Sequence, residues 1–255
     1  MTKAVIINPN TSQVMSADIR QTAERVFQLP WQVEVVNAAA GPESLESWRD
    51  YHLASVTSIP LLEQHREADG YVLACFGDPG LYLLKEVTAA PVIGIAEAAM
   101  SLALLLGGRF GILAGMGRAV QLMDSMVRTY GLESRYAGTV PLDLRVLDFE
   151  QEHTSTITAL ESKARELVQL GADVLLLGCA GLTGFVNELQ QRLPVTIIEP
   201  VEAGCRMLQT VVGANLRISH AGIYAQPAPQ RMNHLHKIFS ASMSEILKTW
   251  EQGQP

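Results

Sequence analysis

Cysteine is scarce in this chain of 255 residues, which contains three: Cys75, Cys179 and Cys205. An odd count with no C-x-x-C motif indicates neither a disulfide framework nor a zinc ribbon. The six histidines are scattered, and no H-E-x-x-H motif occurs. His234 and His236 are two apart on a predicted helix, so their side chains point to nearly opposite sides. We therefore expect reduced thiols in the cytoplasm and no metal site.

Positively charged residues are also few: the chain has 19 Lys and Arg residues and 26 Asp and Glu residues, which gives a net charge of −7. A chain without a basic patch is not expected to bind nucleic acid. The longest apolar stretch, around residues 98–106, is far shorter than the roughly 20 residues that a membrane span needs. The apolar run 4–7 is too short for a signal peptide. We expect a cytoplasmic protein that does not associate with membranes.

Nucleotide-binding and hydrolase motifs are missing as well. Gly115 and Gly117 follow an apolar run, but Val120 takes the third position of a G-x-G-x-x-G loop. No P-loop lysine and no G-x-S-x-G turn is present. The sequence therefore favours a site without a nucleotide cofactor and without a serine nucleophile.

What the chain does contain is a regular alternation of short apolar runs and segments of helical period. Runs this short and rich in Val, Ile and Leu are typical of parallel strands buried on both faces, so the alternation predicts an α/β fold. The predicted strands are 4–7, 33–36, 71–74, 92–96, 110–114, 174–177 and 195–198. The predicted helices are 12–27, 98–106, 118–130, 154–170 and 202–212, and an amphipathic stripe runs from Met232 to Trp250.

The two halves of the chain resemble each other. Cys75 and Cys179 lie 104 positions apart, and the similar segments that begin at Pro91 and Pro194 are offset by 103. We predict two pseudo-symmetric Rossmann-like lobes with mainly parallel sheets and a cleft between them. The first lobe would span 1–106 plus about 213–255, and the second 107–212. Ligands of such sheets bind beyond the carboxyl ends of the strands, where both cysteines lie.

Each of these two cysteines ends an apolar run and precedes a glycine-containing turn, Cys75-Phe76-Gly77 and Cys179-Ala180-Gly181. Backbone amides in such a turn stabilise a thiolate, so we expect them to lower the pKa of both thiols. Two thiols presented in this way suit removal of a proton from one face of a carbon and its return to the other face. Cys205 lies inside a helical run, and we interpret it as a packing residue.

Polar residues at other strand ends have simpler interpretations. Asn10, in the string Asn8-Pro9-Asn10-Thr11-Ser12, suits both a helix cap and a donor to a ligand. Glu97 and Glu199 each follow a predicted strand and open a helix, where a carboxylate is favoured by the helix dipole. We predict that both glutamates act as caps.

These strings together resemble the aspartate/glutamate/hydantoin racemase superfamily, and most closely its hydantoin and allantoin racemase branch. The matching strings are I-N-P-N-T-S, G-P-E-S-L-E, A-C-F-G-D-P-G, P-V-I-G-I-A-E-A-A and L-G-C-A-G. The resemblance implies two lobes, no cofactor, and catalytic roles for Cys75 and Cys179. It also implies substrate contacts at Asn10, Leu45, Phe76, Gly77, Ala180 and Gly181. Phe76, Met116 and Leu182 would supply an apolar wall.

The chain departs from its relatives at Ala114-Gly115-Met116-Gly117, where we would expect Thr or Ser and find no hydroxyl. Amino-acid racemases of the superfamily typically carry Asp and His where this chain has Asn10 and Gly181. This difference favours a substrate that is uncharged at its reacting centre. The hypothesis is therefore cofactor-independent racemisation of a small cyclic ureide, a 5-substituted hydantoin, by a homo-oligomer. Alternatives are an allantoin racemase, an arylmalonate-type decarboxylase, which needs one cysteine, and a binding protein without catalysis.

Overall fold

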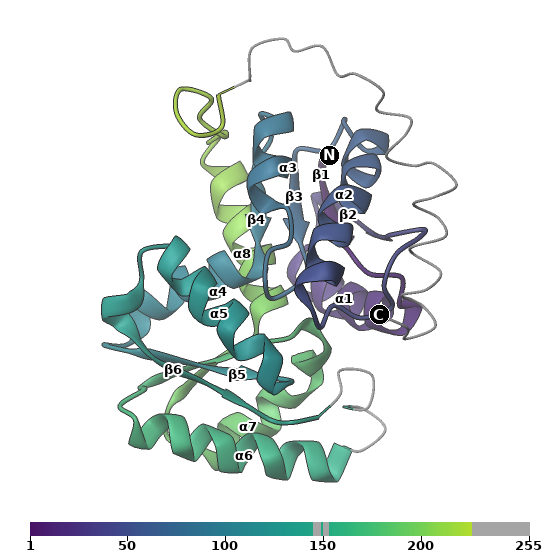
Figure 1. Cartoon of the computed structure of the whole chain (residues 1–255). Coiled ribbons are helices and arrows are strands. Elements are labelled where there is room, and N and C mark those ends of the chain that lie inside the picture. Colours follow the sequence, from purple (N-terminus) through teal and green to yellow (C-terminus); the bar gives the residue numbers. More distant parts are fainter. Residues whose placement is uncertain (145–148, 150–152, 226–255) are drawn as a thin grey trace. The chain divides into compact units, whose positions relative to one another are not determined.

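The computed structural model describes residues 1–144, 149 and 153–225, and strands and helices alternate through them (Figure 1). Two parallel sheets are formed, with strand orders β2-β1-β3-β4 and β6-β5-β7-β8. Their strands are β1 (Thr2–Asn8), β2 (Trp31–Asn37), β3 (Gly70–Leu73), β4 (Val92–Gly94), β5 (Phe110–Ala114), β6 (Tyr136–Pro141), β7 (Val174–Leu177) and β8 (Thr196–Ile198). The same strand order occurs twice, which confirms the predicted α/β fold of two pseudo-symmetric lobes.

Helices cover both faces of each sheet. They are α1 (Gln13–Val26), α2 (Trp48–Gln64), α3 (Leu81–Val87), α4 (Ile95–Leu106), α5 (Gly117–Thr129), α6 (His153–Gln169), α7 (Val186–Arg192) and α8 (Pro200–Gly213), with short 3₁₀ turns η1 (Glu133–Arg135) and η3 (Ala180–Phe185). In the second sheet, α5 lies on one face of β5 and β6, and α6 lies on the other (Figure 1). None of the helices in the described part of the chain has the length and apolarity to cross a bilayer.

The last helix of each half crosses to the other half. Helix α4 follows β4 but also packs against β7, whereas α8 follows β8 and packs against β3 and β4. The two helices also pack against each other. Residues Met1–Tyr224 accordingly form one compact unit.

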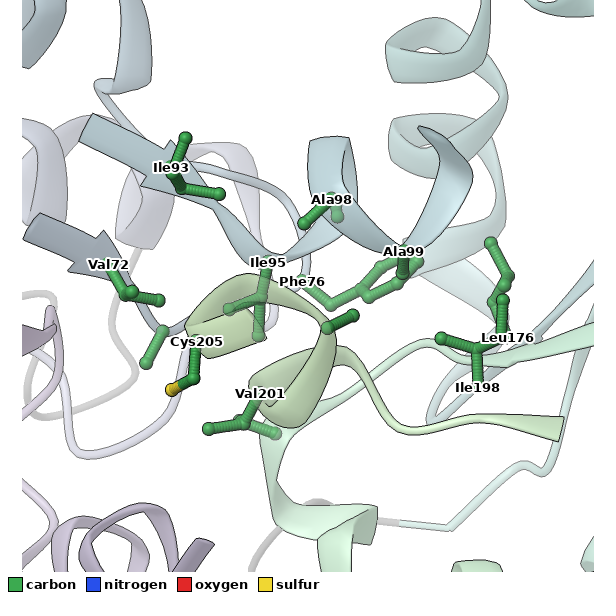
Figure 2. Packing of buried hydrophobic residues seen from close by; sticks show 14 of the residues in the cluster. Val72, Phe76, Ile93, Ile95, Ala98, Ala99, Leu176, Ile198, Val201 and Cys205 are labelled. Atoms are coloured by element: carbon green, nitrogen blue, oxygen red, sulfur yellow. The ribbon is translucent and has the colours of Figure 1, made fainter. Parts of the chain in front are cut away.

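The strands alternate their side chains between separate hydrophobic clusters, as period-two geometry requires. In β7, Val174 and Leu176 face a central cluster, whereas Leu175 and Leu177 face the cluster that α6 and α7 cover. The central cluster takes side chains from both sheets and from α4 and α8 (Figure 2). Its labelled members include Val72 of β3, Leu176 of β7 and Cys205 of α8. The interpretation of Cys205 as a packing residue is confirmed, because it is fully buried there.

The structure differs from the predicted elements in one strand boundary and in several additional elements. The predicted strand 92–96 is two residues too long, since β4 ends at Gly94 and α4 begins at Ile95. Strand β6 and helices α2, α3 and α7 were not predicted from the sequence pattern. The predicted C-terminal stripe from Met232 to Trp250, with His234 and His236, lies outside the described residues, as does most of the segment 213–255 assigned to the first lobe.

Candidate active site

Cys75 is presented by a tight turn at the carboxyl end of β3. The amide of Ala74 still donates to the Ile7 carbonyl at 2.8 Å, so the ladder continues to the residue before the cysteine. The Cys75 carbonyl then accepts from the amides of Gly77 (2.9 Å) and Asp78 (3.0 Å), which closes the turn. Asp78 has a φ of 45°, in the left-handed region that few non-glycine residues adopt.

Cys179 occupies the equivalent position after β7. The amide of Gly178 donates to the Leu113 carbonyl at 2.8 Å, which repeats the bond made by Ala74 in the first half. Cys179 is the N-cap of η3, and its sulfur accepts a hydrogen bond from the Gly181 amide at 3.4 Å. The predicted arrangement, a strand-end thiol before a glycine turn, is therefore present in both halves.

Both cysteines line one pocket, a small cavity of about 40 Å³. Its polar groups are the two thiols, Asn10, Glu46 and Tyr51, and most of its wall is apolar. The remaining lining residues are Met15, Leu45, Ala74, Phe76, Gly115, Met116, Ala119, Met123, Gly178 and Ala180. Neither Cys75 nor Cys179 forms a disulfide, so two free thiols meet one small cavity.

The predicted site residues divide into two groups. Those that line the pocket are Asn10, Leu45, Cys75, Phe76, Met116, Cys179 and Ala180. Gly77, Gly181 and Leu182 do not line it. Gly77 packs against the Tyr51 ring, and the Gly181 amide donates a hydrogen bond to the Cys179 sulfur. Leu182 is fully buried in the cluster that α6 and α7 cover.

Sequence reasoning missed Glu46 and Tyr51, the two polar side chains that the loop after β2 and the start of α2 bring to the pocket. A signal for this helix was available in the sequence. Ser47 and Asp50 form an S-x-x-D start, and the Ser47 hydroxyl accepts from the Asp50 amide at 3.3 Å. Recognising that start would have placed Tyr51 on the first turn of a helix beside the predicted Leu45.

Burial dominates the ionisation of both thiols, contrary to the expectation that the turns lower their pKa. Burial raises the pKa of Cys75 far above its usual range, and the neighbouring Cys179 and Asp78 raise it further, while a hydrogen bond from Tyr51 lowers it. For Cys179, burial raises the pKa to about 11 even though the Gly181 amide lowers it. The amide effect is present, but desolvation of the thiolate is larger.

Asn10 is almost fully buried and belongs to a hydrogen-bond network at the start of α1. Its side-chain oxygen accepts from the Asn8 side chain and from the Ser12 amide, both at 2.9 Å. Ser12 itself is the N-cap of α1. The network fixes the orientation of the Asn10 amide at the pocket wall, where its nitrogen also approaches the Met15 sulfur at 3.4 Å.

Two buried carboxyl groups connect the cysteine turns to α4 and α8. Asp78 accepts from the amides of Ala96 (3.1 Å) and Glu97 (2.8 Å) at the start of α4. Glu199, the N-cap of α8, accepts from two amides there and from the Thr183 hydroxyl. The prediction that Glu199 is a cap is confirmed.

The prediction that Glu97 is a cap is wrong. Asp78 takes that position at α4, and the Glu97 carboxylate pairs with the buried ammonium group of Lys85 at 2.6 Å. A turn distant in sequence thus supplies the carboxylate that Glu97 was expected to supply.

Among residues 1–144, 149 and 153–225, no three His, Cys, Asp or Glu side chains are grouped so that they could hold a metal ion. The pocket itself offers two thiols able to exchange protons, a phenol, a carboxylate and a carboxamide.

The comparisons with known proteins agree with this description. Residues 5–208 match the sequence model of the Asp/Glu/Hydantoin racemase family. A hydantoin racemase of Paenarthrobacter aurescens is 33% identical over 233 residues, which cover 90% of this chain and 99% of that protein.

Solved structures give the same result. The structure of an allantoin racemase from Klebsiella pneumoniae superposes with a TM-score of 0.86 at 31% identity, covering 94% of this chain and 100% of that one. An allantoin racemase from Pseudomonas fluorescens gives a TM-score of 0.87 at 25% identity, covering 91% and 99%. With this sequence match, this fold and this pocket, the chain belongs to the Asp/Glu/hydantoin racemase family and is a racemase.

Proposed function

We propose that this enzyme racemises 5-substituted hydantoins without a cofactor, using Cys75 and Cys179 as the two acid–base groups. The observation that carries the proposal is that both free thiols, each at the end of the third strand of its sheet, line one pocket. The similarity to a hydantoin racemase over most of both chains supports the choice of substrate class.

In this mechanism one cysteine is a thiolate and removes the proton from C5, becoming a thiol. The electron pair of the broken C–H bond moves into the ring carbonyl and gives an enolate. The other cysteine, a thiol, donates its proton to the opposite face of C5 and becomes the thiolate. Backbone amides of the turns after each cysteine are suited to stabilise the enolate oxygen. The roles exchange for the other enantiomer.

The raised pKa values of the thiols are compatible with this chemistry. C5 of a hydantoin is a weak carbon acid, and a base of higher pKa takes its proton more readily once the thiolate has formed. The cost is that the thiolate is rare near neutral pH. Burial of the two thiols therefore makes each thiolate a stronger base but lowers the fraction of enzyme that carries one.

The pocket walls favour an apolar substituent at C5. Met15, Met116 and Met123 line it together with Leu45 and Phe76. Methionine side chains are flexible, so such a wall adapts to substituents of different shape. We infer that 5-alkyl and 5-arylalkyl hydantoins are the best substrates.

Allantoin is the second candidate, and one feature of the pocket favours it. Its ureido substituent carries N–H donors and a carbonyl, and Asn10 and Glu46 offer an amide and a carboxylate at the wall. The similarity to two allantoin racemases supports the same alternative. Both candidates use the same two thiols and differ in the group that the wall must accommodate.

The test is a panel of pure enantiomers followed by circular dichroism: 5-benzyl and 5-isobutyl hydantoin, allantoin, glutamate and aspartate. We expect the two hydantoins to racemise fastest, the amino acids to stay unchanged, and activity to persist in EDTA after dialysis. Faster turnover of allantoin would select the second candidate. Racemisation of glutamate with none of any ureide would overturn the proposal. We also propose that the enzyme is cytoplasmic and forms a homo-oligomer. Light scattering of the pure enzyme would check the oligomeric state.

A further inference from the structure

Tyr51 is the only residue with a hydroxyl group among the described residues that line the pocket. Its side chain shares the cavity with Cys75 and Cys179, yet nothing in the proton transfer proposed above uses it. A buried phenol in a site of acid–base chemistry is placed either by packing or for a hydrogen bond. The contacts of the ring and of the hydroxyl distinguish the two.

The Tyr51 ring packs against the Cys75 turn, and its backbone is anchored in α2. A Cβ atom at Gly77 would lie 2.1 Å from Cε1 of Tyr51, so the ring rests directly on the backbone of the Cys75 turn. The backbone of Tyr51 is fixed in the first turn of α2, where its amide donates to the Ser47 carbonyl at 3.0 Å and its carbonyl accepts from the Ser55 hydroxyl at 2.8 Å. The hydroxyl therefore has little freedom to leave the pocket.

The hydroxyl acts on one thiol in particular. The Tyr51 hydroxyl lies against the Cys75 turn, since a Cβ atom at Gly77 would lie 2.6 Å from its oxygen, and its hydrogen bond lowers the pKa of Cys75. Cys179 has a different donor, the Gly181 amide at 3.4 Å from its sulfur. The two halves of the fold are pseudo-symmetric, but the donors that support their sulfur atoms are not: one is a backbone amide and the other is a phenol from a separate helix.

We infer that Tyr51 is a positioning residue for Cys75. The Tyr51 hydroxyl holds the Cys75 sulfur at the pocket and donates a hydrogen bond to that sulfur whenever it is a thiolate. This inference rests on the proposed function, because it assigns Tyr51 to the same proton transfer. In it, Cys75 loses or gains the proton that C5 gains or loses, and Tyr51 keeps its own proton throughout. Burial and the nearby sulfur atoms raise the pKa of Tyr51, which keeps it a donor.

The first test is the variant Tyr51→Phe, which removes the hydroxyl and keeps the ring on Gly77. Alkylation by iodoacetamide at a fixed alkaline pH is followed separately for the peptides that contain Cys75 and Cys179. Because the rate follows the thiolate fraction, we expect alkylation of Cys75 to slow about tenfold, one pKa unit, and that of Cys179 to stay unchanged. An unchanged Cys75 rate, or equal slowing of both, would overturn the inference.

Tyr71→Phe is the matched control, since Tyr71 is another buried tyrosine whose hydroxyl donates, to the His65 carbonyl, away from the pocket. We expect it to change neither alkylation rate. This arm needs no substrate, so it decides the role of Tyr51 even if the enzyme turns over no hydantoin.

The second test measures deuterium exchange at C5 in single-cysteine backgrounds. Tyr51→Phe should slow exchange about tenfold when combined with Cys179→Ser, where Cys75 does the exchange. It should have no effect when combined with Cys75→Ser. Equal slowing in both backgrounds would contradict a role directed at Cys75 and would indicate a general effect on the pocket.

Discussion

At the scale of single residues, burial dominates the ionisation of Cys75 and Cys179. Strand-end placement before a glycine turn follows from local pattern, and the Gly181 amide does donate to Cys179. The degree of burial depends on α2 and on the facing half of the chain, which local pattern does not reveal. Because desolvation exceeds the amide effect, both thiols are neutral near pH 7 in the free enzyme.

This conclusion predicts the pH dependence of thiol reactivity. With a pKa of about 11, the thiolate fraction of Cys179 rises about tenfold for each pH unit below that value. The alkylation rate of Cys179, measured by peptide mass spectrometry from about pH 7 to pH 10, should rise accordingly. A plateau near pH 8 would contradict it, because it would mean that the turn amides outweigh burial.

A second prediction concerns Gly77. The Cβ of Gly77→Ala would overlap the Tyr51 ring, so either the ring or the turn must shift. We expect a loss of about 1–3 kcal/mol in the free energy of unfolding and at least a tenfold loss of racemase activity. Gly213→Ala is the control, since its Cβ would meet nothing within 4 Å. Equal behaviour of the two variants in urea unfolding and in the racemase assay would refute this account of Gly77.

At the scale of elements, local pattern predicted most strands and long helices but misplaced the boundary between β4 and α4. Val92 to Ala96 is a continuous apolar run, and nothing within it indicates where a strand should end. The cap that starts α4 is Asp78, from the Cys75 turn. A cap that comes from another part of the chain leaves no signal in the local sequence.

This cap is also a prediction of stability. Asp78→Ala would leave the α4 amides and the Tyr130 hydroxyl, which donates to Asp78 at 2.7 Å, without their acceptor. We expect a loss of about 2–4 kcal/mol in urea unfolding. Tyr130→Phe removes one of the three bonds and should cost about 1 kcal/mol. A cost of Asp78→Ala no greater than that of Tyr130→Phe would show that the amide bonds contribute little.

At the scale of the whole molecule, the internal repeat predicted two similar sheets, and the structure contains them. The exchange of α4 and α8 between the halves was not predicted, because a repeat in sequence does not reveal which sheet a helix covers. Side chains from both sheets share the central cluster as a result (Figure 2). The pocket was predicted in outline from the strand ends, while Glu46 and Tyr51 came from a segment whose helix was not recognised.

The buried carboxyl groups predict how the stability of the molecule depends on pH. Burial raises the pKa of Glu199 from 4.5 to about 7, so the folded state binds its proton more tightly than the unfolded state does. Its contribution to stability is therefore complete below about pH 4.5 and is lost as the pH rises through 7. Relative to wild type, Glu199→Gln should gain unfolding free energy between pH 5 and pH 8, on the order of a few kcal/mol. A difference that does not change with pH would refute it.

The central claim, that Cys75 and Cys179 act as a pair, is tested most directly by two single-cysteine variants. Proton NMR in deuterium oxide would follow exchange at C5 while circular dichroism follows racemisation of each enantiomer of 5-benzyl hydantoin. We predict that racemisation falls about 10²–10⁴-fold in both Cys75→Ser and Cys179→Ser. Each variant should still exchange the C5 proton of one enantiomer, and the enantiomer that Cys75→Ser exchanges should be the one that Cys179→Ser does not. Cys205→Ala, in the central cluster, should racemise normally. Near-wild-type racemisation by either single-cysteine variant would contradict the paired mechanism.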